Sequence, residues 1–281
     1  MSFIVKTYAV GTPKREEGKR PLSILMIGDL HGKAHGRKNR DLMEAVRKMR
    51  PDLAVTVGDM VMCVPDFDIS DLLEFYAELR KICPVFAVNG NHETKMRQYT
   101  VTYGTIYKEY DHELQREGVV MLNNRSVTTS FDGLAVRMTG FEADLARYKR
   151  FRPHRLRTGD LIETIGPCSK DPAVFNILLA HTPLFAKTYF SWGADLILSG
   201  HYHGGLVRIG DQPVASPYGR LFPRNGYGMR RNDDQTMIIT SGAGDHEIPL
   251  RIGNPHEIVQ IILDHKEEEA ADGDCGTAPE I

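Results

Sequence analysis

Residues 22–31 read LSILMIGDLH, and this stretch decides the fold. Residues 22–27 form a short apolar run that ends at Gly28, which is typical of a buried β-strand. Two polar side chains able to bind a metal or move a proton, Asp29 and His31, follow at once. A strand that ends in this way is typical of α/β proteins, in which ligands bind beyond the carboxyl ends of the strands.

The same pattern recurs twice further along the chain. Residues 53–57 and 85–88 are apolar runs that we predict to be strands, and each leads into a polar cluster. Residues 39–51 and 70–80 are predicted helices, because each begins at a residue that favours the N-cap and then places apolar side chains on one face. Alternating strands and helices predict right-handed βαβ units with a parallel sheet.

The rest of the chain has a different pattern. A polar helix is predicted at 105–116, and strands at 126–131 and 134–139 are joined by Asp132-Gly133, which favours a two-residue hairpin turn. The other predicted strands are 119–122, 175–180, 196–198, 207–209, 237–240 and 258–263. We therefore expect an α/β fold in which two sheets pack face to face and helices cover their outer sides.

The composition is that of an ordinary globular chain of 281 residues. Hydrophobic residues make up 41% and charged residues 26%, and no apolar run is long enough for a transmembrane helix. A formal charge of -2 argues against an obligate nucleic-acid partner. The four cysteines are scattered and the N-terminal residues do not resemble a secretory signal. We expect a cytoplasmic protein and leave peripheral attachment to a membrane open.

Two segments have an uneven charge. We expect a single domain at 1–265 and a disordered acidic tail at 266–281, where six acids accompany one lysine. Between Arg147 and Arg157 there are six basic residues and no acid. We interpret this run as a solvated loop or helix, with binding of phosphate, RNA or an anionic membrane as the alternative. Four later arginines are candidates for gathering a phosphate substrate: Arg220, Arg224, Arg230 and Arg231.

Five short polar clusters follow predicted strands. They are Gly28-Asp29-Leu30-His31, Gly58-Asp59-Met60-Val61, Gly90-Asn91-His92-Glu93, Ala180-His181-Thr182 and Gly200-His201-Tyr202-His203. Each cluster alone is explained as well by a turn, a helix cap or a buried histidine, but all five at strand ends favour a metal site. Carboxylate, amide and imidazole ligands without a thiolate suit manganese, iron or zinc. Seven such ligands are too many for one tetrahedral ion and match two ions that share a carboxylate.

The order D-x-H, G-D-x-V, G-N-H-E, H-T-P and G-H-x-H, over residues 29–203, resembles the calcineurin-like metallophosphoesterase superfamily. The resemblance implies a four-layer α/β/β/α sandwich of two mixed sheets with a binuclear metal site. It implies one ion held by Asp29, His31 and His203, another held by Asn91, His181 and His201, and Asp59 as the bridge. His92 matches the histidine that assists catalysis, and Glu93, where the family commonly has Asp, is expected to orient it.

The residues after the last cluster narrow the resemblance. The run G-H-Y-H-G-G and the Arg-, Pro- and Tyr-rich stretch at 208–231 resemble a branch of small bacterial phosphoesterases that act at membranes or on lipid-linked substrates. Many members of that branch carry an N-terminal membrane or export segment, and no such segment is recognisable here. We therefore expect either a small phosphate ester or a lipid-linked phosphate as the substrate.

We predict a hydrolase that cleaves phosphate mono- or diesters. Two divalent ions lower the pKa of a bridging water, so hydroxide can attack phosphorus without a Ser or Cys nucleophile. His92, if protonated, can donate to the leaving oxygen. Two alternatives stay open: a pyrophosphatase acting on a nucleotide-linked lipid or sugar, and a non-catalytic scaffold with the same fold.

Three residues near the clusters have open roles. Tyr202 is expected to point away from the ions, into packing or towards a substrate. Cys63 is interpreted as a buried structural thiol. Among the histidines outside the clusters, only His246 has a suggestive position, because its loop follows a predicted strand.

Overall fold

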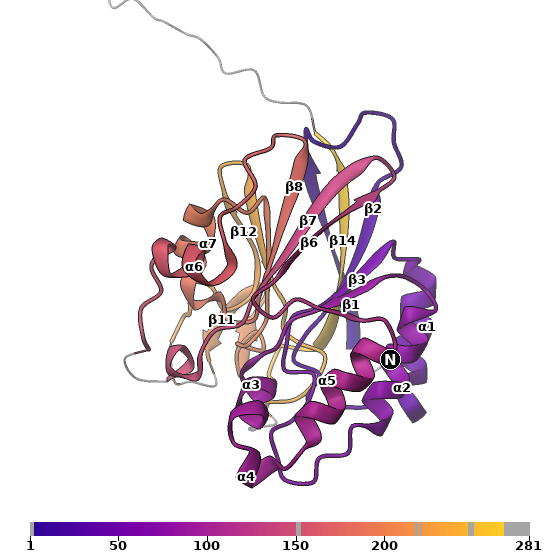
Figure 1. Ribbon diagram of the computed structural model, residues 1–281, viewed down its shortest axis with the longest axis vertical. Helices are drawn as coiled ribbons and strands as arrows, with labels where there is room; N and C mark the ends of the chain where they lie inside the picture. Colours follow the sequence, from indigo (N-terminus) through magenta and orange to yellow (C-terminus); the bar gives the residue numbers. More distant parts are fainter. Residues whose placement is uncertain (1–2, 150–152, 217–218, 220, 247–249, 267–281) are drawn as a thin grey trace, which may run out of the picture.

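The computed structural model describes residues 3–149, 153–216, 219, 221–246 and 250–266. Two six-stranded sheets form its centre (Figure 1). The first sheet contains, in spatial order, β1 (Phe3–Thr12), β14 (His256–His265), β2 (Leu22–Ile27), β3 (Leu53–Thr56), β4 (Val85–Ala87) and β5 (Val120–Met121). The second contains β12 (Gly228–Asn232), β13 (Gln235–Ile239), β9 (Leu196–Ser199), β8 (Val174–Ala180), β7 (Leu134–Phe141) and β6 (Ser126–Phe131).

Helices cover the outer side of each sheet (Figure 1). On the first sheet lie α1 (Arg40–Met49), α2 (Ser70–Arg80), α3 (Asn91–Gln98), α4 (Thr100–Tyr103) and α5 (Ile106–Arg116). On the second lie α6 (Thr158–Ile165) and α7 (Ala186–Trp192). The short elements are the 3-10 turns η1 (Arg37–Asn39), η2 (Leu145–Tyr148) and η3 (Pro183–Phe185) and the ribbon of β10 (Val207–Ile209) and β11 (Gln212–Ala215).

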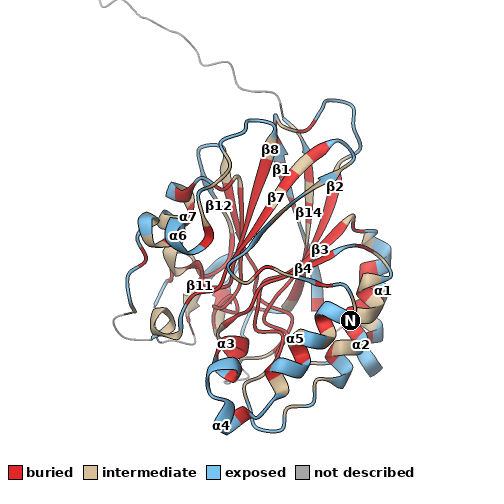
Figure 2. Ribbon diagram, viewed as in Figure 1, coloured by how far each residue is buried: buried red, intermediate tan, exposed pale blue. Residues whose placement is uncertain are grey.

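Three hydrophobic cores hold the layers together. Strand β2 contributes to two of them, because all six of its residues are buried and successive side chains point to opposite faces of the sheet. Leu25 and Ile27 pack beneath the helices of the first sheet, whereas Ile24 and Met26 face the second sheet. A third core lies between the second sheet and its two helices. Figure 2 shows the buried strands between the half-exposed helices, and the predicted four-layer α/β/β/α sandwich is confirmed.

Both sheets are mixed, as the resemblance implies. The change from parallel units to hairpins along the chain is incomplete, because the second sheet has a parallel centre, in which β8 lies between β7 and β9. Its hairpins lie at the edges, as β6 with β7 and β12 with β13. At the first of these turns Asp132 and Gly133 have φ of 47° and 87°, the left-handed geometry that the dipeptide predicts.

Some local predictions need correction. Strand β1 was not predicted; it pairs in parallel with β14 at the sheet edge, and five of its ten residues are exposed, so it lacks a continuous apolar run. The Asn39 side chain accepts the N–H of His35 and does not cap α1. Helix α2 begins at Ser70 itself, with Ile69 in the N-cap position.

Two charged segments fall partly outside the described residues. The predicted acidic tail lies there except for Lys266, so its disorder and the single domain at 1–265 stay predictions. Within the basic run, residues 150–152 are outside the described part of the chain, as is Arg220.

Candidate metal centre

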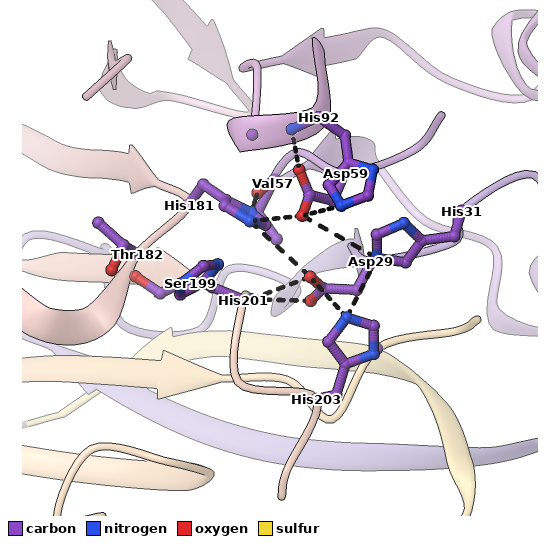
Figure 3. A network of polar contacts seen from close by, with 12 residues as sticks. Asp29, His31, Val57, Asp59, His92, His181, Thr182, Ser199, His201 and His203 are labelled. Carbon is purple, nitrogen blue, oxygen red and sulfur yellow. Dashed lines mark hydrogen bonds and ion pairs between the residues drawn. The ribbon is translucent and has the colours of Figure 1, made fainter. Parts of the chain in front are cut away.

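The polar clusters meet beyond the carboxyl ends of β2, β3, β8 and β9 (Figure 3). These strands end side by side within their sheets because β2 pairs in parallel with β3, and β8 with β9. The loop after β4 adds the first turn of α3, which begins at Asn91. Segments far apart in the sequence are therefore brought to one site, as the position of the clusters predicts.

Three groups of side chains have ligand atoms that lie within 4.8 Å of one another. They are Asp29, His31 and His203; His31, Asp59 and His92; and Asp59, His181 and His201. The first group is one of the two ligand sets that the resemblance implies. The third joins the expected bridging residue to two members of the other set. All the side chains in these groups are buried.

Asp59 lies between the groups. Its Oδ2 is 3.1 Å from Nε2 of His181, 3.9 Å from Nε2 of His31 and 4.0 Å from Nε2 of His92. Its Oδ1 accepts the backbone N–H of His92 at 2.9 Å. Although burial opposes ionisation, the charges of His181 and His92 hold the pKa of Asp59 well below its usual value. The carboxylate is therefore charged and has one oxygen directed at three imidazoles.

Asp29 links the loops after β2 and β9. Both of its carboxylate oxygens accept the backbone N–H of His201, at 3.0 Å each, and Oδ1 lies 3.5 Å from Nε2 of His203. The side chain is fully buried, and burial raises its pKa to about 7. A bound cation would favour the charged form of this buried carboxylate, because it would offset both the cost of burial and the nearby negative charge of Asp59.

The backbone holds these side chains in an unusual conformation. Five candidate ligands have a left-handed backbone: φ is 49° at Asp29, 49° at His31, 51° at Asp59, 73° at His201 and 50° at His203. Such a conformation costs a non-glycine residue roughly 1 kcal/mol or more, and it persists where the surrounding structure enforces it, often at functional sites. Gly90 and Gly200 are part of that structure, since a Cβ would meet the Asp59 carboxylate at Gly90 and the Asp29 carboxylate at Gly200.

Two buried atoms of the cluster show that the site suits a metal ion. Among the described residues, Oδ1 of Asn91 has no hydrogen-bond partner, and Nε2 of His181 has none apart from its 3.1 Å ion-pair contact with Oδ2 of Asp59. In His181 the Nδ1–H donates to the carbonyl of Val57 at 2.7 Å, so Nε2 is the ring nitrogen that faces the cluster, and in the neutral ring its lone pair is available to a metal. Burial lowers the pKa of this ring, but Asp59 outweighs burial and raises it to about 9. The position of Nε2 therefore attracts positive charge.

His92, unlike the neutral His181 ring, presents a hydrogen-bond donor to the cluster. Its Nδ1 accepts the backbone N–H of Cys63 at 2.9 Å, so in the neutral ring the proton is on Nε2, which faces Asp59. Burial lowers the pKa of His92, yet the Asp59 carboxylate raises it to about 9. Nε2 carries a hydrogen whether the ring is neutral or protonated. The ring therefore offers the cluster a hydrogen-bond donor and no lone pair for a metal.

Glu93 does not make the contact that was expected of it. The four hydrogen bonds of its carboxylate all come from backbone N–H groups and none from the His92 ring. The donors are Gly90 at 2.9 Å, Asp59 at 2.9 Å, Met60 at 2.7 Å and Val61 at 3.2 Å. The carboxylate therefore fastens the loop that carries Asp59 to the turn that precedes His92.

Three residues near the cluster were not predicted to belong to it. The Tyr148 ring lies 5.0 Å from the His201 ring and 6.0 Å from that of His181, between centroids. The ring of His246, whose loop position was the only signal, lies 5.2 Å from His203. Arg251 donates to Nδ1 of His203 at 3.2 Å and to the carbonyl of Ser241 at 2.8 Å. No sequence pattern pointed to Tyr148 or Arg251.

The remaining candidates are less central. Tyr202 is buried, with its ring centroid 5.4 Å from that of His201, which agrees with a role in packing. Cys63 is half-buried, less than expected. The candidate arginines do not gather at one place: Arg224 and Arg230 line one surface pocket, and Arg231 lines another.

Comparison with known proteins assigns the family. The family model described as calcineurin-like phosphoesterase matches residues 22–205, which include all five clusters. The chain belongs to the calcineurin-like phosphoesterase family. It is a hydrolase that acts on phosphoester bonds, in a family that depends on metal ions.

Individual relatives match most of the chain. The uncharacterized protein YpbG of Bacillus subtilis is 29% identical over 263 residues, which cover 92% of this chain and 87% of that protein. The phosphodiesterase YaeI of Escherichia coli is 25% identical, with coverage of 88% and 84%. The transmembrane protein with metallophosphoesterase domain of Bos taurus is 29% identical and matches 92% of this chain, which spans only 56% of that protein. In the described part of this chain no helix has the length and apolar character needed to cross a membrane.

Proposed function

We propose that this protein hydrolyses phosphate mono- or diesters with the help of two divalent metal ions. The observation that carries the proposal is the position of Asp59, whose Oδ2 is shared between imidazoles of two ligand groups. A carboxylate shared in this way suits a bridge between two ions. Two ions held by these side chains would supply the charge stabilisation that displacement at phosphorus needs.

The proposed ligands come from the first and third of the groups described above, with Asn91 added. Asp29, His31 and His203 would hold one ion, Asn91, His181 and His201 would hold the other, and Asp59 would belong to both. Bound there, the ions would lower the pKa of a water molecule and neutralise charge on the phosphoryl oxygens. Imidazole, carboxylate and amide ligands suit manganese, iron or zinc. Burial lowers the pKa of His31 to about 3 and also lowers the pKa of His201 and His203, so these three rings are neutral and keep their lone pairs available.

His92 is the proposed proton donor. The backbone N–H of Cys63 occupies its Nδ1, which leaves the Nε2–H to face the cluster. From there it can donate to a phosphoryl oxygen or to the leaving oxygen as negative charge develops on it. Glu93 is a positioning residue in this proposal, because its carboxylate binds backbone N–H groups on both sides of the loop that carries Asp59.

Replacing His92 tests this assignment. We expect His92→Ala to lower kcat on bis(p-nitrophenyl) phosphate, assayed with Mn²⁺, by roughly 10²- to 10⁴-fold, the usual contribution of a positioned acid. The metal content, measured by elemental analysis of the same preparation, should stay at that of the unmodified protein, because His92 is not a proposed ligand. His112→Ala is the control, since this histidine is exposed on α5.

The two measurements separate the possible roles of His92. A normal kcat in the variant would show that the ring takes no part in the reaction. A loss of metal in parallel with activity would instead make His92 a ligand, and the proposed division of roles would be wrong.

A further inference from the structure

A pocket of about 390 Å³ opens beside the metal centre, between α3, α4 and η2. The lining includes Asn91, Lys95, Tyr99, Tyr103, Leu145 and Tyr148. None of these except Asn91 belongs to the five sequence clusters. Apart from Asn91, the residues that line the pocket have no role in the proposed reaction at phosphorus.

Two residues of the pocket wall also border the candidate metal centre. Asn91, a proposed ligand, forms part of this wall. Tyr148 forms another part, and its ring also packs near His201 and His181, at centroid distances of 5.0 Å and 6.0 Å. A phosphate ester with its phosphorus at the metal centre can therefore place one organic substituent in this pocket.

The lining suits an aromatic ring. Three of the side chains are tyrosines, and a fourth is Leu145. Tyrosine rings bind planar groups by stacking or by edge-to-face contact, with little loss of conformational freedom on binding. The volume is at the lower end of the usual range for ligand pockets, roughly 300–1,000 Å³, which fits one ring system and its attached atoms better than a lipid with two acyl chains.

Part of this wall is held in place before any ligand binds. At η2 the side chain of Asp144 accepts the N–H of Ala146 at 3.0 Å and caps the turn that carries Leu145 and Tyr148. The guanidinium of Arg147 forms an ion pair with the same carboxylate. Tyr103, on α4, is only 8% exposed, whereas Tyr99 is 52% exposed at the rim. A preformed wall of this kind lowers the entropy cost of binding.

We propose that this tyrosine pocket binds an aromatic substituent of the substrate, such as a nucleobase or an aryl group. The inference rests on the proposed function, because it places the phosphorus of the ester at the metal centre. It narrows the substrate class to phosphate esters that carry a ring. Esters of small aliphatic alcohols leave the pocket unfilled.

Adenosine 5′-monophosphate and ribose 5-phosphate test the pocket, because ribose 5-phosphate has a hydroxyl group where the nucleotide has its base. Each is used to inhibit the hydrolysis of bis(p-nitrophenyl) phosphate by the full chain with Mn²⁺. We expect the nucleotide to have an inhibition constant roughly 10-fold lower, which is typical of one base stacked on an aromatic side chain. In Tyr99→Ala this ratio should fall to about 2 or less, since part of the stacking surface is lost, while inhibition by ribose 5-phosphate stays unchanged.

The matched control is Val101→Ala, because Val101 is a fully exposed residue of α4 outside the pocket lining. It should keep the ratio of the unmodified protein. Equal inhibition by the two compounds, or a ratio that survives in Tyr99→Ala, would overturn the pocket proposal and leave the phosphoesterase proposal standing. If the unmodified protein does not hydrolyse the diester, the proposed function fails, and calorimetric binding of the same two compounds to the same variants then decides about the pocket.

Discussion

Asp59→Asn should lower the hydrolysis of bis(p-nitrophenyl) phosphate by on the order of 10³-fold or more, because metal ions contribute several kcal/mol of charge stabilisation to such transition states. The substitution changes little in shape. An asparagine still offers Oδ1 to the N–H of His92, which that atom of Asp59 accepts at 2.9 Å. It replaces the shared Oδ2 with an amide nitrogen, which cannot bind a metal. We therefore expect fewer than two ions per chain.

The control for this prediction is Asp66→Asn, since Asp66 is an exposed aspartate in the loop before α2. It should retain full activity and a full metal content. Unfolding in urea, followed for both variants, checks that the fold is intact. An Asp59→Asn protein that keeps its rate and both ions would show that Asp59 does not bridge the metals.

Glu93→Ala should produce the largest loss of stability among substitutions in this site, about 3–5 kcal/mol. The carboxylate is 1% exposed and accepts four backbone N–H groups, from Gly90, Asp59, Met60 and Val61. Alanine leaves these buried donors without their acceptor, and each unsatisfied group adds to the cost. The loop that carries Asp59 loses its attachment to α3, so metal affinity should fall as well.

Urea unfolding measures the change in free energy, and Glu163→Ala on α6 is the matched control because Glu163 is exposed. Glu93→Asp, which keeps the carboxyl group but shortens the side chain, should lose less stability than Glu93→Ala. A Glu93→Ala protein as stable as the Glu163→Ala protein would show that the Glu93 carboxylate does not hold the Asp59 loop against α3. If stability is unchanged but kcat falls, Glu93 acts on His92 after all, as its neighbouring position first suggested.

Much of the architecture could be predicted because the central strands are buried on both faces. Residues 22–27 and 175–180 are such strands, and their continuous apolar runs mark them clearly. Strand β1 lacks this mark, because it lies at a sheet edge and its side chains alternate irregularly between core and solvent. Its partner β14 is at the other end of the chain, so no pattern within the β1 segment predicts the pairing.

The candidate ligands could also be found from sequence, because each follows a predicted strand and parallel strands end together. The relation between His92 and Glu93 could not. Successive residues of a helix project about 100° apart, so neighbours in sequence on the first turn of α3 face different partners. The carboxylate turns to backbone N–H groups, and the ring takes its hydrogen bond from Cys63.

Tyr148 shows a second limit. It lies in a run that is notable in sequence only for its basic residues, and the structure brings its ring close to His201 because η2 packs against α3. Contacts of this kind depend on the packing of segments that are far apart in the sequence, and the periodicity of one segment does not predict them. The proposed substrate pocket is therefore visible only in the fold, whereas the candidate metal ligands are visible in the sequence motifs.

We propose that two metal ions bound by these side chains support hydrolysis. The most direct test strips the purified protein with a chelator and restores Mn²⁺ stepwise while bis(p-nitrophenyl) phosphate turnover and bound metal are recorded together. We predict almost no turnover after stripping and a rate that rises until two ions are bound per chain. Full turnover in the stripped protein, or a maximum rate at one bound ion, would contradict the binuclear site.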